Sequence, residues 1–151
     1  MPQSLAQLYL HVVFSTKQRE TLLRDDQVRE KTHAYLGGIC RNLESPALIV
    51  GGTADHVHLL CRQSKNQAVC DLLRELKRAS SLWIKEQFRD LAGFHWQQGY
   101  GAFSVSPSHV EALVGYIGNQ QAHHAQVSFQ DEFRQLCRKY GLEIDERYVW
   151  N

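Results

Sequence analysis

The chain has almost no net charge. Its 17 lysine and arginine residues and 16 aspartate and glutamate residues leave a formal charge of +1 at pH 7. This balance excludes a basic tail or a uniformly basic surface of the kind that coats nucleic acid. Any nucleic acid that the protein binds must therefore be held by local patches of positive charge.

Closely spaced cysteines and long apolar runs are also missing. The four cysteines show no C-x-x-C spacing, and we interpret them as reduced, mostly buried thiols. No apolar run reaches the ~18 residues of a membrane span, and no signal peptide is recognisable. We therefore expect a soluble, cytoplasmic protein that does not bind a membrane.

Repeats and low-complexity segments are absent as well. A chain of 151 residues with 43% hydrophobic and 22% charged residues is typical of one globular domain, which we assign to residues 1–151. Apolar patterns and capping residues predict four strands and four helices. The strands are expected at 8–14, 47–50, 55–60 and 94–105, and the helices at 25–42, 66–88, 106–124 and 128–140.

The order of these elements predicts an α+β fold. A β-α-β-β-α-β order is that of the ferredoxin-like arrangement, an antiparallel sheet with two helices on one face, here followed by two C-terminal helices. The first and third strands are the most apolar and should be central. Gly51-Gly52 indicates a bend or bulge, and Gly99 and Gly101 a bulge or a close backbone approach.

Two histidines lie on the third predicted strand. His56 and His58 alternate with Val57 and Leu59, so both imidazoles should lie on one face while the apolar residues pack the core. Two imidazoles side by side can bind a metal ion, but they are also compatible with two hydrogen-bonded histidines on a half-exposed strand. We expect them on the face that the first two helices leave free.

The helix expected at 106–124 carries further polar groups on one face. Tyr116, Gln120 and His123 follow at helical spacing. A tyrosine hydroxyl can be a nucleophile, and a glutamine oxygen can bind a hard cation. Tyr116 could equally be a core aromatic, Gln120 a solvated residue, and His123-His124 a favourable pair at the C-terminal end of the helix.

Together these motifs resemble the small single-tyrosine transposases of the HUH endonuclease family, in which two histidines flank a hydrophobic residue. The resemblance covers nearly the whole chain in the right order. It rests on DHVHL at 55–59, WQQGYGAFSV at 96–105, YIGNQ with two histidines at 116–124, HVVFSTK at 11–17 and DERY at 145–148.

The resemblance implies an enzyme that cuts and rejoins single-stranded DNA at hairpins near the ends of an insertion sequence. His56, His58 and Gln120 match the ligands of a divalent metal, Mg²⁺ or Mn²⁺, and Tyr116 matches the nucleophile, which would form a 5′-phosphotyrosine. It also implies a homodimer in which Tyr116 of one chain works with His56 and His58 of the other. The residue before Asn119 is Gly118, where the family carries a larger residue.

Two clusters of basic residues are candidates for DNA binding. Arg74, Lys77, Arg78 and Lys85 follow at helical spacing, and Lys17 and Arg19 come directly after the first strand. The helical row could equally be a solvated face paired with glutamates.

Two other functions stay open. One is a non-catalytic binder of single strands that uses Phe14, Trp96, Tyr100 and Phe103 as stacking platforms. The other is a host-adopted relative that cuts hairpins of chromosomal repeats.

Overall fold

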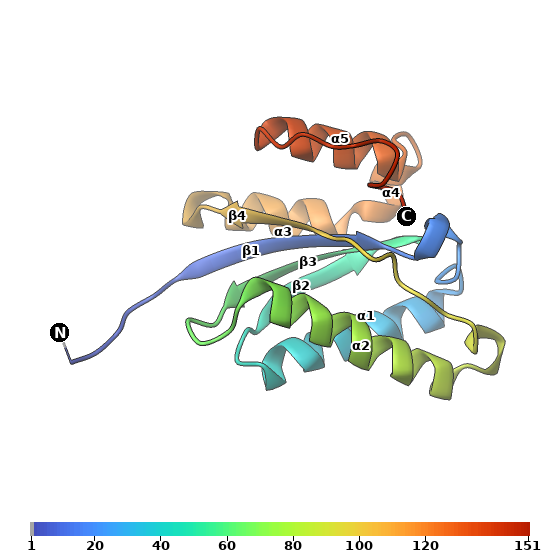
Figure 1. Ribbon diagram of the computed structural model, residues 1–151, viewed down its shortest axis with the longest axis horizontal. Helices are drawn as coiled ribbons and strands as arrows, with labels where there is room; N and C mark the ends of the chain where they lie inside the picture. Colours follow the sequence, from blue (N-terminus) through green and yellow to red (C-terminus); the bar gives the residue numbers. More distant parts are fainter. Residues whose placement is uncertain (1) are drawn as a thin grey trace.

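The computed structural model of the chain describes residues 2–151. Its four strands form one antiparallel sheet in the order β2-β3-β1-β4 (Figure 1). The strands are β1 (Leu8–Ser15), β2 (Ala47–Gly52), β3 (His56–Gln63) and β4 (Gly101–Val105). The predicted α+β class and the central position of the first and third strands are confirmed.

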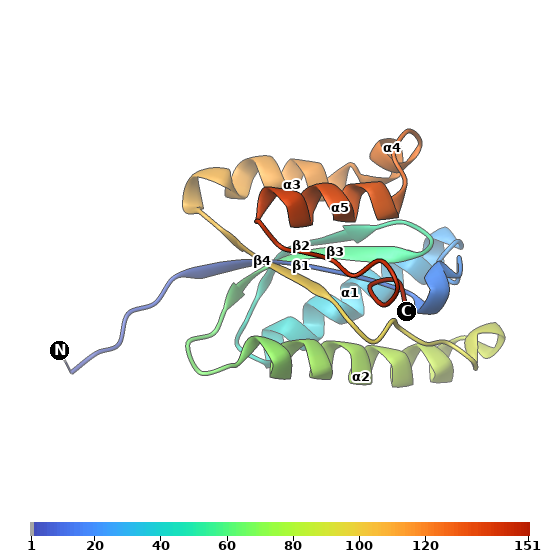
Figure 2. The ribbon, with the colours of Figure 1, turned by 45° about the horizontal axis from the view of Figure 1, so that its top comes forward.

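Two long helices cover one face of this sheet. α1 (Asp26–Asn42) begins at Asp25, whose carboxylate accepts hydrogen bonds from the amides of Gln27 and Val28. α2 (Val69–Gln87) runs beside it (Figure 2). Alternate residues of the central strands, among them Val12, Phe14, Val57 and Leu59, form the main core with these helices.

The opposite face of the sheet is also covered. α3 (Val110–Gly118), α4 (Gln120–His124) and α5 (Phe129–Lys139) lie over it (Figures 1 and 2). A second core joins Val13 of β1 and Phe103 of β4 to Phe129 and Phe133 of α5. The two histidines lie, as expected, on the face that the first two helices leave free, and this face is covered in turn by α3, α4 and α5, because the apolar side of α5 packs on it.

The helix expected at 106–124 is interrupted. A short 3₁₀ turn, η3 (Pro107–His109), precedes α3, and Asn119 separates α3 from α4 with φ −106° and ψ 21°. Glycine and asparagine are poor helix formers, so the pair Gly118-Asn119 is a natural place for this break. The expected last helix begins as predicted, with the Ser128 hydroxyl accepting a hydrogen bond from the amide of Asp131.

The fourth strand is shorter than predicted. Residues 94–100 are irregular apart from a bridge between Trp96 and Thr16. The ammonium of Lys77 on α2 donates hydrogen bonds to the carbonyl oxygens of Gln97, Gln98 and Gly99, at 2.8, 3.2 and 2.5 Å. These carbonyl groups turn toward a cation instead of a neighbouring strand, which explains the irregular segment.

Glycine is required where helices approach the sheet closely. A Cβ on Gly51 would lie 2.4 Å from the carbonyl oxygen of Ile117 in α3. Both Gly51 and Gly52 stay within β2, and the irregularity of this strand falls between Ala47 and Ile49 instead. At Gly101 a Cβ would lie 2.7 Å from the ring of Phe133, so here the glycine permits a close approach.

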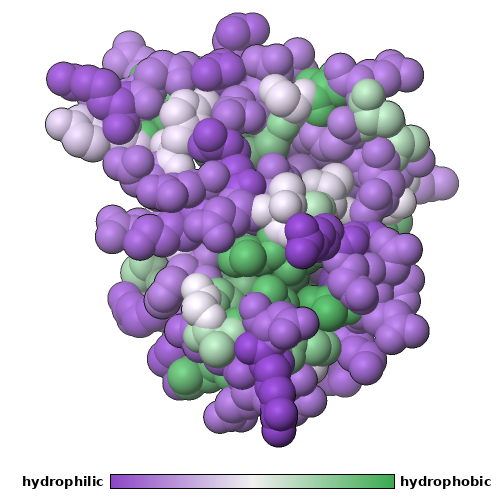
Figure 3. All heavy atoms as spheres, turned by 90° about the vertical axis from the view of Figure 1, so that its right-hand side faces the viewer, coloured by the Kyte–Doolittle hydropathy of each residue, from purple (hydrophilic) through white to green (hydrophobic). Residues whose placement is uncertain are grey.

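The surface at the end of the sheet where β1 finishes is largely hydrophilic, with hydrophobic residues gathered near its middle (Figure 3). Among the described residues, no helix is both long and apolar enough to cross a membrane. All four cysteines are free thiols, three of them buried and Cys70 exposed.

Candidate active site

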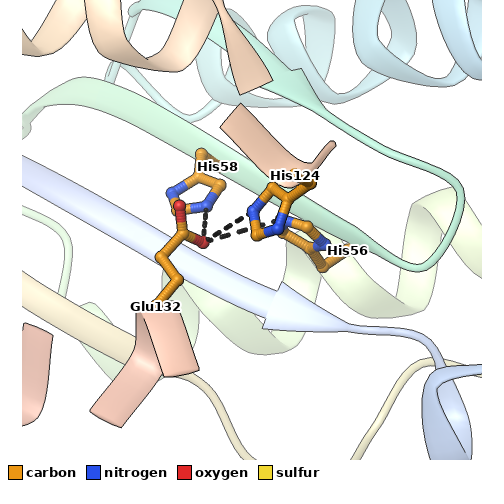
Figure 4. A group of neighbouring side chains, drawn as sticks. All are labelled: His56, His58, His124 and Glu132. Carbon is orange, nitrogen blue, oxygen red and sulfur yellow. Dashed lines mark hydrogen bonds and ion pairs between the residues drawn. The ribbon is translucent and has the colours of Figure 1, made fainter. Parts of the chain in front are cut away.

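β3 brings His56 and His58 to the sheet face that α3, α4 and α5 cover. Both side chains are completely buried. The chain reverses between β2 and β3, and α4 and α5 then close over the two rings (Figure 4). The two imidazoles lie on one face of the sheet, as their spacing predicts. Neither ring is open to solvent.

The outer nitrogen of each ring is held by a neighbour. His56 Nδ1 lies 2.7 Å from a carboxylate oxygen of Asp55 and 3.0 Å from the hydroxyl of Thr53. His58 Nδ1 lies 2.8 Å from Nε2 of His11, a buried residue of β1. With both Nδ1 atoms engaged in this way, both Nε2 atoms face inward to the same place, which is how metal-binding histidines are oriented.

Tyr116 and Gln120 reach this place despite the break between α3 and α4. The rings of Tyr116 and His58 have centroids 6.0 Å apart, within the same chain. Gln120 is buried, and its Oε1 lies 3.1 Å from Nε2 of His56. The structure thus brings together the four residues that the sequence singled out, His56, His58, Tyr116 and Gln120.

Glu132 of α5 lies at the centre of the group. One of its carboxylate oxygens, Oε1, is 2.8 Å from Nε2 of His58, 3.1 Å from Nε2 of His124 and 3.7 Å from Nε2 of His56 (Figure 4). The other, Oε2, accepts hydrogen bonds from the hydroxyl of Tyr116 and from Nε2 of Gln120. A single carboxylate therefore connects the histidines with the tyrosine.

Burial and the carboxylate of Glu132 together shift the pKa values of this group. Burial alone would raise the pKa of Glu132, but the facing imidazoles of His124 and His58 lower the pKa well below the usual range. Burial and the hydrogen bond to Glu132 raise the pKa of Tyr116. Burial would lower the pKa of His124, yet the facing carboxylate raises it. The pKa of His58 is lowered, mainly because the ring is buried.

Three residues of this group were not singled out as site residues from the sequence. His11, His124 and Glu132 depend on contacts between segments far apart in the chain, and no local spacing links them. One signal for Glu132 does exist. It lies on the same face of α5 as Phe129 and Phe133, so a carboxylate stands where the helix pattern calls for an apolar residue.

The donor set fits a divalent cation. Ligand atoms of His56, His58, His124 and Glu132 all lie within 4.8 Å of one another, and the oxygen of Gln120 adjoins them. Imidazole nitrogens and carboxylate or amide oxygens are ordinary ligands of such ions. These residues therefore satisfy the chemical requirement for a metal site.

A cleft leads to the tyrosine. This cavity of about 360 Å³ lies between α3, α5 and the end of β4, and Tyr116 and Glu132 line it together with His11, His109 and Lys139. A second cavity, between α3 and α4, is also lined by Tyr116.

The basic residues expected to bind DNA divide into two groups. Lys17 and Arg19 form the turn η1 (Lys17–Arg19) directly after Thr16, whose amide donates to the carbonyl of Asp55, so they lie near the histidines. The row belongs to α2, which covers the face of the sheet opposite to α3, the helix that carries Tyr116 (Figure 1).

Several members of that row are engaged by other groups. Arg74 is paired with Asp71 and Arg78 with Glu75. Lys77 holds the segment 97–99, and burial lowers its pKa to about 8. Lys85 lies in the last turn of α2 and is partly exposed.

The proposed stacking platform is mostly inaccessible. Phe14, Trp96 and Phe103 are buried, whereas Tyr100 is 40% exposed. A single-strand binder that stacks bases on these four aromatic rings is therefore not supported.

A family profile and two solved structures similar to this chain all describe transposases. Residues 4–120 match the profile of a family described as IS200-like transposase. No curated protein matches the chain. A candidate transposase from Deinococcus radiodurans R1 is similar in structure, with a TM-score of 0.64 and 27% identity over 78% of this chain and 93% of that chain.

A REP-associated tyrosine transposase, solved bound to a REP hairpin, has a TM-score of 0.57 and 14% identity over 84% of this chain and 76% of that chain. At this identity the likeness concerns the fold. The family match ends at residue 120, so His124 and Glu132 lie beyond it.

Proposed function

The chain belongs to the IS200-like transposase family, and we propose that it cuts and rejoins single-stranded DNA at hairpin ends through a covalent bond to Tyr116. The observation that carries this proposal is the position of the Tyr116 hydroxyl. It lies at the end of a cleft and beside a group of inward-facing ligand atoms from His56, His58, Gln120 and Glu132.

In the proposed reaction, the oxygen of Tyr116 attacks the phosphorus of the scissile phosphodiester. A bond forms between this oxygen and phosphorus, and the bond from phosphorus to the 3′ oxygen breaks, leaving a 5′-phosphotyrosine and a free 3′ hydroxyl. The bond energy is conserved, so the reverse attack by a 3′ hydroxyl rejoins a strand. The Tyr116 proton has a nearby acceptor in Oε2 of Glu132.

His56, His58 and Gln120 are the residues we propose as ligands of a divalent cation, Mg²⁺ or Mn²⁺. Such an ion, when bound, polarises the scissile phosphate and stabilises the charge that develops on it. Asp55 and His11 support the ligands by holding His56 and His58 through their Nδ1 atoms.

A DNA hairpin is the proposed partner. The fold neighbour bound to a REP hairpin supports this substrate class, as does the family. Lys17 and Arg19 are proposed phosphate contacts close to the histidines. Arg74, Lys77, Arg78 and Lys85 would contact a strand that continues around the β4 edge, where three of them line a cavity of about 540 Å³ with Trp96 and Tyr100. A cytoplasmic location remains a prediction.

Host use of the same chemistry is a second candidate function. The hairpin in the fold neighbour is a REP hairpin, which favours repeats as an alternative to the ends of an insertion sequence. Sequencing the flanks of the gene distinguishes the two, since the hairpins there would be the ends of an element in the first case and copies of a repeat dispersed through the chromosome in the second.

The proposal is tested by incubating the protein with single-stranded DNA that carries a labelled hairpin. In the presence of Mg²⁺ or Mn²⁺, a covalent protein–DNA band is expected on a denaturing gel. Chelation of the metal should remove the band without unfolding the protein. A protein that binds the hairpin tightly, yet forms no adduct with any divalent ion, would be a binding module and would refute the proposed function.

A further inference from the structure

His124 has a buried nitrogen without a hydrogen-bond partner. Its Nδ1 donates a hydrogen bond to the carbonyl oxygen of Val127 at 2.6 Å, so Nε2 of the neutral ring carries a lone pair. This Nε2 is buried, makes no hydrogen bond and lies 3.1 Å from Oε1 of Glu132. The side chain is nine-tenths buried and directed into the histidine cluster. A lone pair that faces a carboxylate oxygen at this distance requires a cation or a proton between them.

Two further imidazole nitrogens face the same carboxylate oxygen. Oε1 of Glu132 has three imidazole Nε2 atoms around it, those of His56, His58 and His124. Each of the three rings is held at its other nitrogen, by Asp55, His11 and the Val127 carbonyl respectively. Three imidazole nitrogens are thus oriented toward Oε1 of Glu132 by groups outside the cluster.

The separations suit a bound ion. Ligand atoms about 2.1 Å from a tetrahedral ion lie about 3.4 Å from one another. Oε1 is 2.8, 3.1 and 3.7 Å from the three Nε2 atoms, and all four ligand atoms lie within 4.8 Å of one another, so side-chain movements of about 1 Å would bring them around one ion.

We propose that His124 and Glu132 join His56 and His58 in binding one transition-metal cation in the absence of DNA. This inference deepens the proposed function, since it concerns the same metal site. The proposed ligands differ from those given above, because His124 and Glu132 lie beyond the family match, which ends at residue 120. Three imidazoles and one carboxylate select Zn²⁺ or Co²⁺ over Mg²⁺, which prefers oxygen ligands and retains water.

The ligand set has a consequence for catalysis. Four protein ligands close a tetrahedral site, whereas catalysis on a phosphate requires an open coordination position. A phosphate oxygen must therefore enter as a fifth ligand or replace one of the four. Entry of the phosphate as a fifth ligand would keep Glu132 in place, with its Oε2 still available to accept the proton of the Tyr116 hydroxyl.

The test is a Co²⁺ and Zn²⁺ titration of the whole, DNA-free protein. Wild type should bind one Co²⁺ per chain with visible absorption typical of a nitrogen-rich site, and a large excess of Mg²⁺ should not displace it. Glu132→Gln and His124→Gln should each weaken binding by roughly tenfold or more. Matched controls are Asp131→Asn, at an exposed neighbouring carboxylate, and His95→Gln, at an exposed histidine outside the group of four.

X-ray absorption of the Zn²⁺-loaded wild type counts the imidazole ligands without any substitution that could disturb folding. Three imidazoles are expected. Two imidazoles, no binding of Co²⁺ or Zn²⁺, or wild-type affinity in both test variants would each overturn this inference. The hairpin-adduct assay is independent of these outcomes, because an adduct formed with Mg²⁺ would leave the proposed function intact.

Discussion

The hydroxyl of Tyr116 donates a hydrogen bond to Oε2 of Glu132, and Oε1 of the same carboxylate lies 2.8 Å from Nε2 of His58. The proposed nucleophile and the proposed metal site are thus joined by one buried side chain. Such an arrangement orients the hydroxyl and provides an acceptor for its proton.

Replacement of Glu132 should therefore slow the chemical step. We expect Glu132→Ala to lower the rate of adduct formation by about a hundredfold, the usual loss when a positioned proton acceptor is removed. Hairpin affinity should stay close to wild type. The rate is measured by quenched time courses with labelled hairpin, with Glu143→Ala at an exposed carboxylate as the control. An unchanged rate would show that Glu132 has no part in the reaction.

His11 should act through His58. Its Nε2 lies 2.8 Å from Nδ1 of His58, and burial together with His58 lowers the pKa of His11 to about 3, so the ring stays neutral. We expect His11→Phe to keep a buried ring but remove this contact, and to weaken metal binding about 10–100-fold. Isothermal titration with Mn²⁺ checks this. Equal affinity in wild type and variant would mean that His11 only fills space.

His33 should make the folded state sensitive to acid. Burial, with the charge of Arg29 nearby, lowers its pKa from 6.5 to about 4. Between these values the unfolded chain binds a proton that the folded chain does not, so the free energy of unfolding should fall as pH drops from about 6.5 to about 4. Below that range the contribution of His33 is constant. Urea unfolding of wild type and His33→Gln at several pH values measures this contribution to the free energy of unfolding. Identical pH profiles for the two proteins would contradict the role given to His33.

The arrangement of sites in an assembly is a separate question. Within one chain, Tyr116 already lies beside His58, so a site formed by a single chain is geometrically complete. The family resemblance instead predicts a homodimer with shared sites, and mixing two inactive variants distinguishes the two. Tyr116→Phe mixed with the double variant His56→Ala/His58→Ala should recover cleavage if sites are shared across a dimer. Continued inactivity, with subunit exchange demonstrated, would assign each site to one chain.

Much of the fold could be predicted because its signals are local. The cap at Asp25, the cap at Ser128 and the alternation around His56 and His58 all depend on residues a few positions apart. The break at Asn119 was missed because Tyr116, Gln120 and His123 keep a helical period across it. The middle of α2 and the segment 97–99 interact through Lys77, and no spacing in the sequence indicates such a contact.

In the candidate site, too, local spacing indicates some of the contacts, while others join distant parts of the chain. Tyr116, Gln120 and the two histidines are brought together as their spacing and the family resemblance suggested, whereas the contact between His58 and Glu132 joins residues 74 positions apart. The burial of the histidines was also missed, since it depends on α5 packing its apolar side on the sheet. A charged residue within that apolar side was the available clue.

The central claim is that Tyr116 becomes covalently bound to DNA, and mass spectrometry of the adduct tests it most directly. The protein is incubated with hairpin DNA and Mn²⁺, digested with nuclease and protease, and searched for a peptide carrying a nucleotide. The expected result is a nucleotide on the peptide that contains Tyr116, no adduct in Tyr116→Phe despite nearly unchanged hairpin affinity, and a normal adduct in Tyr100→Phe. A nucleotide on another residue, or an adduct that persists in Tyr116→Phe, would contradict the account.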